Sequence, residues 1–356
     1  MPAVYGMRSG LYTCGIQDDQ PEGRWGSKQA GEGGSVADID PQQRRSGLRA
    51  MQSEERVALL ALLLSGRTKW AKVVQDILDA GSVWTVLEKA FGSGDALFDI
   101  EKSPLTGAMT EARALLDWCI SHGVGVHAFW EEHYPASLRE IHEMPPVVFT
   151  KGTVTNDRRA IAVVGSRRAS PRAREIASNI ATVLSERDVT VVSGLAAGID
   201  TAAHTAALRA GGRTVAVIGT GINHYYPREN QKLQDEIADR GMVLSQFLPD
   251  MPPTRKNFPM RNAVMSGYAA ATVVVEAGEH SGARIQTRYA LNHGRPVIFT
   301  RELLANQWAR DYSKRPGVYV ASGIEELLEI VDGILTESTM TADEFVAALE
   351  ASELGW

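Results

Sequence analysis

The chain has 356 residues, of which 44% are hydrophobic and 22% charged, a composition that excludes wholesale disorder, a collagen repeat and a coiled coil. Its net charge is −6, and its two cysteines, Cys14 and Cys119, are too few for a disulfide framework or a zinc site, so we expect a reducing compartment and no metal. The longest charge-free apolar stretch, residues 263–275, is too short to span a membrane, and no signal-peptide pattern opens the sequence. We therefore expect a cytoplasmic protein without membrane association.

The first part of the chain divides into a polar tail and a helical region. Residues 1–50 are rich in Gly, Arg, Asp, Gln and Ser and poor in aliphatic side chains, which predicts a disordered tail. Apolar residues then recur at helical spacing, and this pattern predicts a small all-helical, SAM-like domain over residues 51–122. Its helices are expected at residues 54–64, 70–78, 83–90 and 110–121.

From residue 160 the pattern changes to short β-branched runs that alternate with helical windows. Strands are expected at residues 160–164, 189–192, 214–218, 242–245, 271–275 and 296–299, and helices at 171–186, 201–210, 228–239, 262–270 and 283–293. Because strands without polar alternation are buried on both faces, we expect an α/β fold with an extended Rossmann-like, doubly wound and mostly parallel sheet over residues 123–335. Residues 336–356 are expected to form one acidic C-terminal helix.

Basic side chains gather in two segments of the Rossmann-like domain. Residues 151–180 contain seven Lys or Arg against two acids, and residues 251–300 contain six against two. Ligands of doubly wound sheets bind beyond the carboxyl ends of the strands. The two basic segments can therefore form a local anion site although the whole chain is acidic.

Glycine-containing turns follow the first three strands of this domain. One such turn is a weak signal, because any strand-to-helix turn can need glycine for its geometry, but three in succession favour phosphate binding by backbone amides at helix N-termini. The full spacing of a dinucleotide fingerprint is missing, so no redox cofactor is expected. The candidate phosphate-binding residues are Gly165, Ser166, Arg167, Arg168, Gly194, Gly198, Gly219 and Gly221, together with Ser281 and Gly282 after the fifth strand, where Ser281 either caps a helix or binds a phosphate.

A further basic motif follows the fourth strand. Lys256 and Arg261 can hold phosphates while a base stacks on Phe258, and Asn262 completes the motif. A structural alternative places Phe258 in the core and the charges at a solvated helix start.

Residues for catalysis are scarce. His204 lies in an alanine-rich helix without a metal-binding partner motif, and we interpret it as a packing residue. Neither a G-x-S-x-G elbow nor a Walker lysine motif occurs. Glu276 is the one acid at a strand end with the position of a base. No catalytic constellation is predicted, and we expect a binding protein rather than an enzyme.

Five motifs in fixed order resemble the DprA/Smf family of DNA-processing proteins. They are GSR at 165–167, SGLAAGID at 193–200, AVIGTGINHYYPRENQKL at 216–233, FPMRN at 258–262 and VVVEAGEHSGARIQT at 273–287, and the resemblance extends over about residues 54–300. It implies a Rossmann-like core that binds single-stranded DNA, forms a homodimer and loads a RecA-type recombinase, without enzymatic activity. It also implies that Arg167, Lys256, Phe258 and Arg261 line the DNA pocket.

The chain departs from the family's pattern at several places. Ala263 stands where relatives carry a third basic residue, and the family's proline-glycine turn after Phe299 is missing. The alternative from another class is a nucleotide-sensing protein or a LOG-type phosphoribohydrolase, because a phosphate pocket on a Rossmann-like sheet also suits a free nucleotide. The paired glycines and following glutamate of the hydrolase signature are absent around Glu276, which disfavours the enzyme.

Overall fold

The computed structural model describes residues 41–92, 104–279 and 281–339. Residues 1–40 of the predicted tail and residues 340–356 of the predicted acidic helix lie outside the described residues. The chain divides after Arg49 into two units, and the architecture below is that of the second unit, which begins at Ala50 and so contains all of the first helix except residues 41–49.

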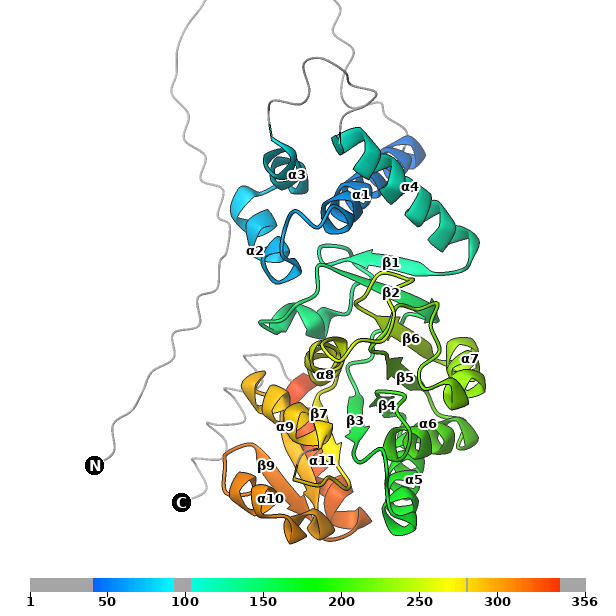
Figure 1. Ribbon diagram of the computed structural model, residues 1–356. Helices are drawn as coiled ribbons and strands as arrows, with labels where there is room; N and C mark the ends of the chain where they lie inside the picture. Colours follow the sequence, from blue (N-terminus) through cyan, green and yellow to red (C-terminus); the bar gives the residue numbers. More distant parts are fainter. Residues whose placement is uncertain (1–40, 93–103, 280, 340–356) are drawn as a thin grey trace, which may run out of the picture. The chain divides into compact units, whose positions relative to one another are not determined.

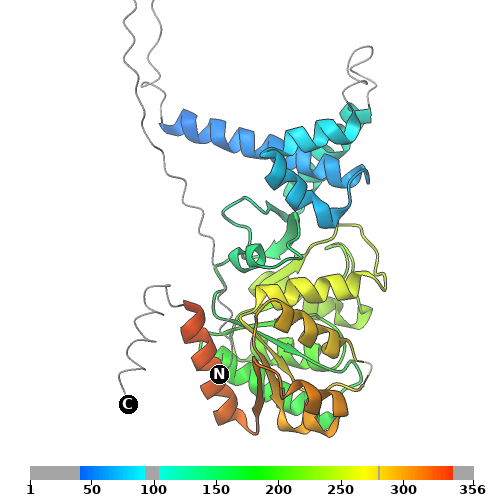
Figure 2. The same ribbon diagram turned by 90° about the vertical axis from the view of Figure 1, so that its left-hand side faces the viewer.

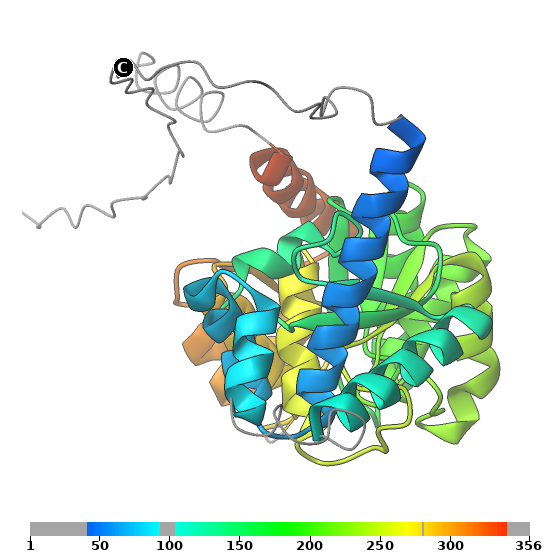
Figure 3. The same ribbon diagram turned by 90° about the horizontal axis from the view of Figure 1, so that it is seen from above.

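Four helices precede the sheet, as the apolar periodicity predicts. They are α1 (Pro41–Leu64), α2 (Trp70–Ala80), α3 (Val83–Phe91) and α4 (Pro104–Ser121), and α1 lies between α4 and the α2–α3 pair (Figure 3). The apolar run at the end of α1 is buried, with Leu59, Leu60 and Leu62 inaccessible to solvent. The helix α1 begins within the stretch predicted to be disordered. Pro41 suits its first turn, because the backbone N–H that proline lacks would have no hydrogen-bond acceptor within the helix there.

The sheet has nine strands in the order β1-β2-β6-β5-β4-β3-β7-β8-β9. All neighbours from β6 to β9 pair in parallel, whereas β1 and β2 form an antiparallel edge. The mostly parallel, Rossmann-like sheet is therefore confirmed. Its strands are β1 (Gly125–Ala128), β2 (Val147–Gly152), β3 (Ala160–Val164), β4 (Thr190–Ser193), β5 (Thr214–Val217), β6 (Met242–Ser245), β7 (Ala271–Val274), β8 (Val297–Thr300) and β9 (Val318–Ala321).

Helices cover both faces of the sheet. Alternate residues of β3 point to opposite sides: Ile161 belongs to the core under α5, α6 and α11, and Ala162 to the core under α8 and α9. Figure 1 shows these two layers, and in Figure 2 the pair α8 and α9 lies in front of the strands. The helices after β3 are α5 (Pro171–Ser185), α6 (Ile199–Arg209), α7 (Gln231–Arg240), α8 (Asn257–Tyr268), α9 (Gly282–Asn292), α10 (Gln307–Tyr312) and α11 (Ile324–Thr339).

The order of the strands reverses between β3 and β7. The chain builds β4, β5 and β6 outward on one side of β3, then returns through α8 and builds β7, β8 and β9 on the other side. At such a switch point the loops after the two central strands diverge and leave a crevice beyond their carboxyl ends. The loops after β3 and β7 therefore flank the expected ligand site.

Several elements of the Rossmann-like region differ from the prediction: α10 and α11 are not among the predicted helices, and α11 runs across the predicted boundary between residues 335 and 336. The helix α8 begins at Asn257, before the predicted start at residue 262, because Pro259 is tolerated in a first turn, where its missing N–H has no helical partner. The FPMRN motif consequently lies within a helix. The edge strand β9 was not predicted, since its side chains are partly exposed and its short run lacks the buried pattern of the other strands.

Candidate functional site

A pocket of about 510 Å³ lies at the switch point, beyond the carboxyl ends of β3 and β7. Its walls are the loop of residues 165–168 after β3, the first part of α8 and the start of α9. We call it the strand-end pocket. Nine of the predicted site residues line it: Gly165, Ser166, Arg167, Arg168, Phe258, Arg261, Asn262, Ser281 and Gly282.

The N-terminus of α5 is fixed beside this pocket. Ser170 caps the helix, because its Oγ accepts a hydrogen bond from the backbone N–H of Ala173 at 3.1 Å. The same hydroxyl donates to Glu276 Oε2 at 2.6 Å, and the backbone N–H of Ser170 donates to Glu276 Oε1 at 3.1 Å. Glu276 thus joins the end of β7 to the start of α5.

An aromatic and a cationic group share one wall of the pocket. The guanidinium carbon of Arg167 lies 5.0 Å from the centroid of the Phe258 ring. Tyr226 approaches the same ring, with the two centroids 5.4 Å apart, and is 40% exposed. Arg167 is exposed and has no carboxylate partner within the described ranges. Its charge is therefore open to an anionic ligand.

Arg261 lies below the surface of the pocket and has a different role from Arg167. Only 5% of it is exposed, and its Nη1 donates to the backbone carbonyls of Gly194 and Val217, the latter at 2.7 Å. Asp200 is equally buried and accepts hydrogen bonds from the backbone N–H groups of Gly194 and Ala196, each at 3.2 Å. Arg261 therefore ties together the ends of two neighbouring strands.

Burial perturbs both of these charged groups. Desolvation lowers the pKa of Arg261 to about 10, although the negative charge of Asp200 opposes this shift. Desolvation likewise raises the pKa of Asp200, against the charges of Arg261 and Arg167 and the two backbone hydrogen bonds. The pair is a buried support under the pocket, with Arg167 as the exposed cation above it.

The start of α9 forms the opposite wall. Ser281 caps the helix by accepting a hydrogen bond from the backbone N–H of Ala283 at 3.2 Å. The carbonyl of Gly282 accepts from Asn262 Nδ2 at 3.4 Å, which joins α9 to α8. Ser281 accepts from two amides of the first turn, those of Ala283 and Arg284, and the helix dipole favours an anion at this end of α9.

Five predicted residues lie outside the lining of the strand-end pocket: Gly194, Gly198, Gly219, Gly221 and Lys256. Gly219 lies directly against the Phe258 ring, because a Cβ added there would approach Phe258 Cδ1 to 2.8 Å. Gly198 has φ of +86°, a conformation that favours glycine, and lines a neighbouring groove. Lys256 is exposed at the residue before α8.

The sequence motifs did not single out Tyr226 as a site residue. Its signal was present in the Tyr225-Tyr226-Pro227 turn after β5, but nothing in the sequence shows that this turn reaches Phe258 on α8. His204 is fully buried, and its Nδ1 lies 2.7 Å from Thr214 Oγ1, as expected of a packing residue.

Neither a metal-ligand cluster nor a membrane-spanning helix is found among the described residues. In those residues no three His, Cys, Asp or Glu side chains lie close enough together to hold a metal ion. No helix in the same part of the chain combines the length and apolar character of a membrane span.

Sequence comparisons connect the region around this pocket with known proteins. The profile of the family described as DNA recombination-mediator protein A matches residues 125–329. DNA processing protein DprA of Streptococcus pneumoniae (strain ATCC BAA-255 / R6) is 41% identical over 169 residues, 47% of this chain and 60% of that protein. DNA processing protein DprA of Bacillus subtilis (strain 168) is 36% identical over 178 residues, 49% of this chain and 60% of that protein. The chain thus spans less than two thirds of the length of these relatives.

Solved structures share the architecture. The X-ray structure of DNA processing protein A from Streptococcus pneumoniae superposes with a TM-score of 0.62 at 29% identity and covers 77% of this chain and 97% of that chain. A structure of DNA processing protein A from Helicobacter pylori, described for its unique single-stranded DNA binding mode, has a TM-score of 0.53 at 21% identity, over 60% of this chain and 96% of that chain. At that identity the second likeness shows the fold alone.

Proposed function

Since this chain belongs to the DNA recombination-mediator protein A family, we propose that it binds single-stranded DNA in the strand-end pocket. The observation that carries the proposal is the position of Arg167 over the Phe258 ring, beside the N-terminus of α9. Single-strand binding combines cations that hold phosphates with aromatic faces on which bases stack. Both groups occur here on one wall of one pocket.

Each group has a separate part in this binding. Arg167 and the N-terminal end of α9 hold phosphate oxygens, which fixes the strand without reading its sequence. Phe258 offers its ring to a base, and Tyr226 extends that aromatic surface. Because every base has a π-face, the sequence preference is expected to be weak.

The family supports a finer proposal about partners. The description of its members as recombination mediators suggests that the bound strand is passed to a RecA-type recombinase. The motif resemblance further implies a homodimer. We assign the chain no reaction, and the hydrogen bonds from Ser170 to Glu276 support this assignment by giving the acid a structural role.

The proposal is tested by fluorescence anisotropy with labelled oligothymidine and the matching duplex, at low and at physiological salt. We expect selective, salt-sensitive binding of the single strand, and a loss of about tenfold or more in Arg167→Ala, the size typical of a charged hydrogen bond. Arg172→Ala is the control, because Arg172 is an exposed arginine of α5 that pairs with Glu175 at 3.0 Å and lines no pocket described here.

Two outcomes would contradict the proposal. Equal affinity of wild type and Arg167→Ala for the oligothymidine would show that the strand does not bind in the strand-end pocket. Binding of a free nucleotide without binding of the strand would instead favour the nucleotide-sensing class, so mononucleotides are included as competitors.

A further inference from the structure

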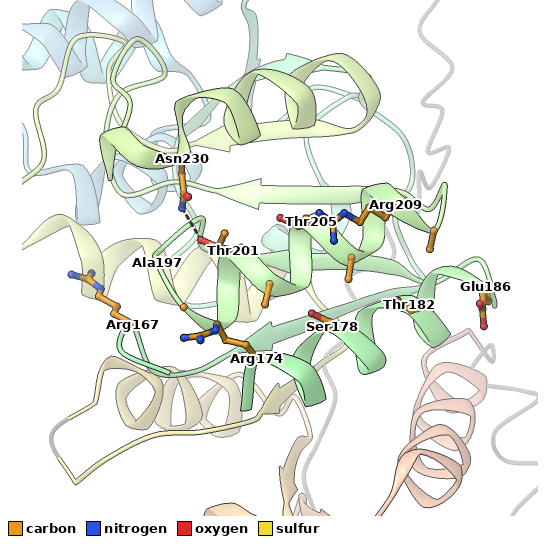
Figure 4. A pocket seen from close by; sticks show the side chains of 14 residues that line it. Arg167, Arg174, Ser178, Thr182, Glu186, Ala197, Thr201, Thr205, Arg209 and Asn230 are labelled. Carbon is orange, nitrogen blue, oxygen red and sulfur yellow. Dashed lines mark hydrogen bonds between the residues drawn. The ribbon is translucent and has the colours of Figure 1, made fainter. Parts of the chain in front are cut away.

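A second concave surface lies next to the strand-end pocket, between α5 and α6. This α5–α6 groove encloses about 750 Å³ and is shown in Figure 4. On each helix its polar side chains recur every four residues, so they form one row along each wall. The rows are Arg174, Ser178 and Thr182 on α5, and Thr201, Thr205 and Arg209 on α6.

The polar groups of the groove have unused hydrogen-bonding capacity. Arg174 donates one of the five N–H groups of its guanidinium to the backbone carbonyl of Ala169, at 2.7 Å. Thr201 is occupied, because it donates to the carbonyl of Ala196. Within the described part of the chain, Arg209 and Thr205 have no side-chain hydrogen bond. In Figure 4 the Arg209 side chain extends back along α6 toward Thr205.

The charge of the groove is positive and unevenly placed. Three arginines line it, Arg167, Arg174 and Arg209, and the one carboxylate in its lining is Glu186. Glu186 follows the last residue of α5 and lies at the far end of the groove from Arg167 (Figure 4). An anionic chain entering at Arg167 therefore meets cations along the groove and a repulsive charge where it ends.

Arg167 joins the groove to the strand-end pocket. Among the residues described, it is the one side chain that lines both cavities. Of the adjacent residues Ala196 and Ala197, the first lines the strand-end pocket and the second lines the groove. A strand with one phosphate at Arg167 thus has a continuous lined path from the pocket into the groove.

We propose that the α5–α6 groove is a second subsite that binds the sugar-phosphate backbone of the single strand beyond the strand-end pocket. This rests on the proposed function. Arginines and hydroxyls are the side chains that hold phosphate oxygens. Among the residues that the structure describes, no aromatic side chain lines the groove, so the bases of this part of the strand face solvent. From Arg174 to Glu186 the wall is about 18 Å long at 1.5 Å per helical residue, enough for several nucleotides.

The test measures affinity against oligothymidine length in the full chain. Affinity for short oligomers, which fill the strand-end pocket only, is expected to be the same in wild type and Arg209→Ala. For long oligomers, Arg209→Ala and Arg174→Ala are each expected to bind several-fold more weakly, and the slope of log affinity against log salt is expected to fall in magnitude by about 0.7 per lost phosphate contact. Arg172→Ala again controls for the loss of one positive charge on α5.

A variant of opposite sign removes the repulsion at the end of the groove. Glu186→Gln is expected to raise the affinity for long oligomers and leave that for short ones unchanged. If wild type binds oligothymidine but Arg209→Ala and Glu186→Gln match it at every length, the groove is no subsite and the strand-end pocket stands alone. If wild type binds no oligothymidine, the proposed function fails and this subsite fails with it.

Discussion

The Arg167 guanidinium lies over the Phe258 ring, although Arg167 follows the central strand β3 and Phe258 lies in the first turn of α8. The contact exists because the chain returns through α8 to place β7 beside β3, so α8 passes the loop after β3. One wall of the strand-end pocket thereby presents a cation and an aromatic face together. We expect the contribution of Arg167 to binding to depend on the salt concentration and that of Phe258 to be independent of it.

The charged residues should govern the salt dependence. Arg167→Ala and Lys256→Ala are each expected to weaken binding of all strand sequences and to reduce the magnitude of the salt slope by about 0.7, because each removes one phosphate contact. Anisotropy titrations at four or more salt concentrations measure the slope. Lys256 does not line the pocket. If the salt slope is unchanged in Lys256→Ala but reduced in Arg167→Ala, Lys256 does not contact the bound strand.

The aromatic residue should govern affinity without changing the slope. Phe258→Ala is expected to weaken binding by about 1–3 kcal/mol, the range measured for loss of one base–aromatic stack. Its salt slope should equal that of wild type, since no charge is removed. A reduced salt slope in Phe258→Ala would mean that the ring acts by holding Arg167 in place. An affinity equal to that of wild type would mean that Phe258 has a purely structural role.

Gly219→Ala tests the position of the ring rather than its presence. The added Cβ would lie 2.8 Å from Phe258 Cδ1, too close for an undisturbed ring, so we expect a shifted Phe258 and weaker binding in a folded protein. Gly333→Ala in α11 is the matched control, because nothing lies near its added Cβ and alanine favours a helix. Equal oligothymidine affinity of the two variants would show that binding does not depend on the ring's position.

The sheet and much of its site could be predicted from local pattern. Strands buried on both faces give apolar runs without alternation, and the predicted and observed strands β3 and β6 have the same bounds. Parallel strands bring their carboxyl ends to one edge, so residues 165–168 and 281–282 meet although they are distant in sequence. The rule on switch points then predicts a ligand site in the crevice between the loops after β3 and β7.

The role of Arg261 could not be predicted, because its partners are fixed by tertiary structure. Two of them are backbone carbonyls, of Gly194 and Val217, which carry no sequence signal. From the sequence, Arg261 in a basic motif beside Phe258 is therefore expected to hold a phosphate, the same role as that predicted for Lys256. The burial of Arg261 distinguishes the two, since Lys256 is exposed.

Removing Arg261 is expected to destabilise the fold. Arg261→Ala leaves the Asp200 carboxylate buried without the opposing charge of Arg261 and removes the Nη1 hydrogen bonds to the carbonyls of Gly194 and Val217, a change that costs about 1–3 kcal/mol for each buried group left unsatisfied. Urea unfolding followed by tryptophan fluorescence measures the loss. Adding Asp200→Asn should restore part of it, because the uncompensated charge is removed. A double variant no more stable than Arg261→Ala would contradict the coupling.

His204 is expected to make the protein sensitive to acid. Burial, with the nearby charge of Arg261, lowers the pKa of His204 to about 3, whereas the unfolded chain titrates near 6.5. As the pH falls below about 6.5 the unfolded chain takes up this proton first, so stability is lost at about 1.4 kcal/mol per pH unit until about pH 3. Thr214 Oγ1 donates to the carbonyl of Val191, which leaves His204 Nδ1–H as the donor to Thr214, a hydrogen bond that the amide of an asparagine can replace.

His204→Asn isolates this effect from the other titrating groups, which are common to both proteins. Between pH 7 and pH 5 the free energy of unfolding of wild type should fall by about 2 kcal/mol more than that of the variant, the value that 1.5 pH units below 6.5 give. Urea titrations of both proteins at the two pH values supply the difference. Identical pH dependence would mean that His204 binds a proton in the folded state near its ordinary pKa, which its full burial next to Arg261 opposes.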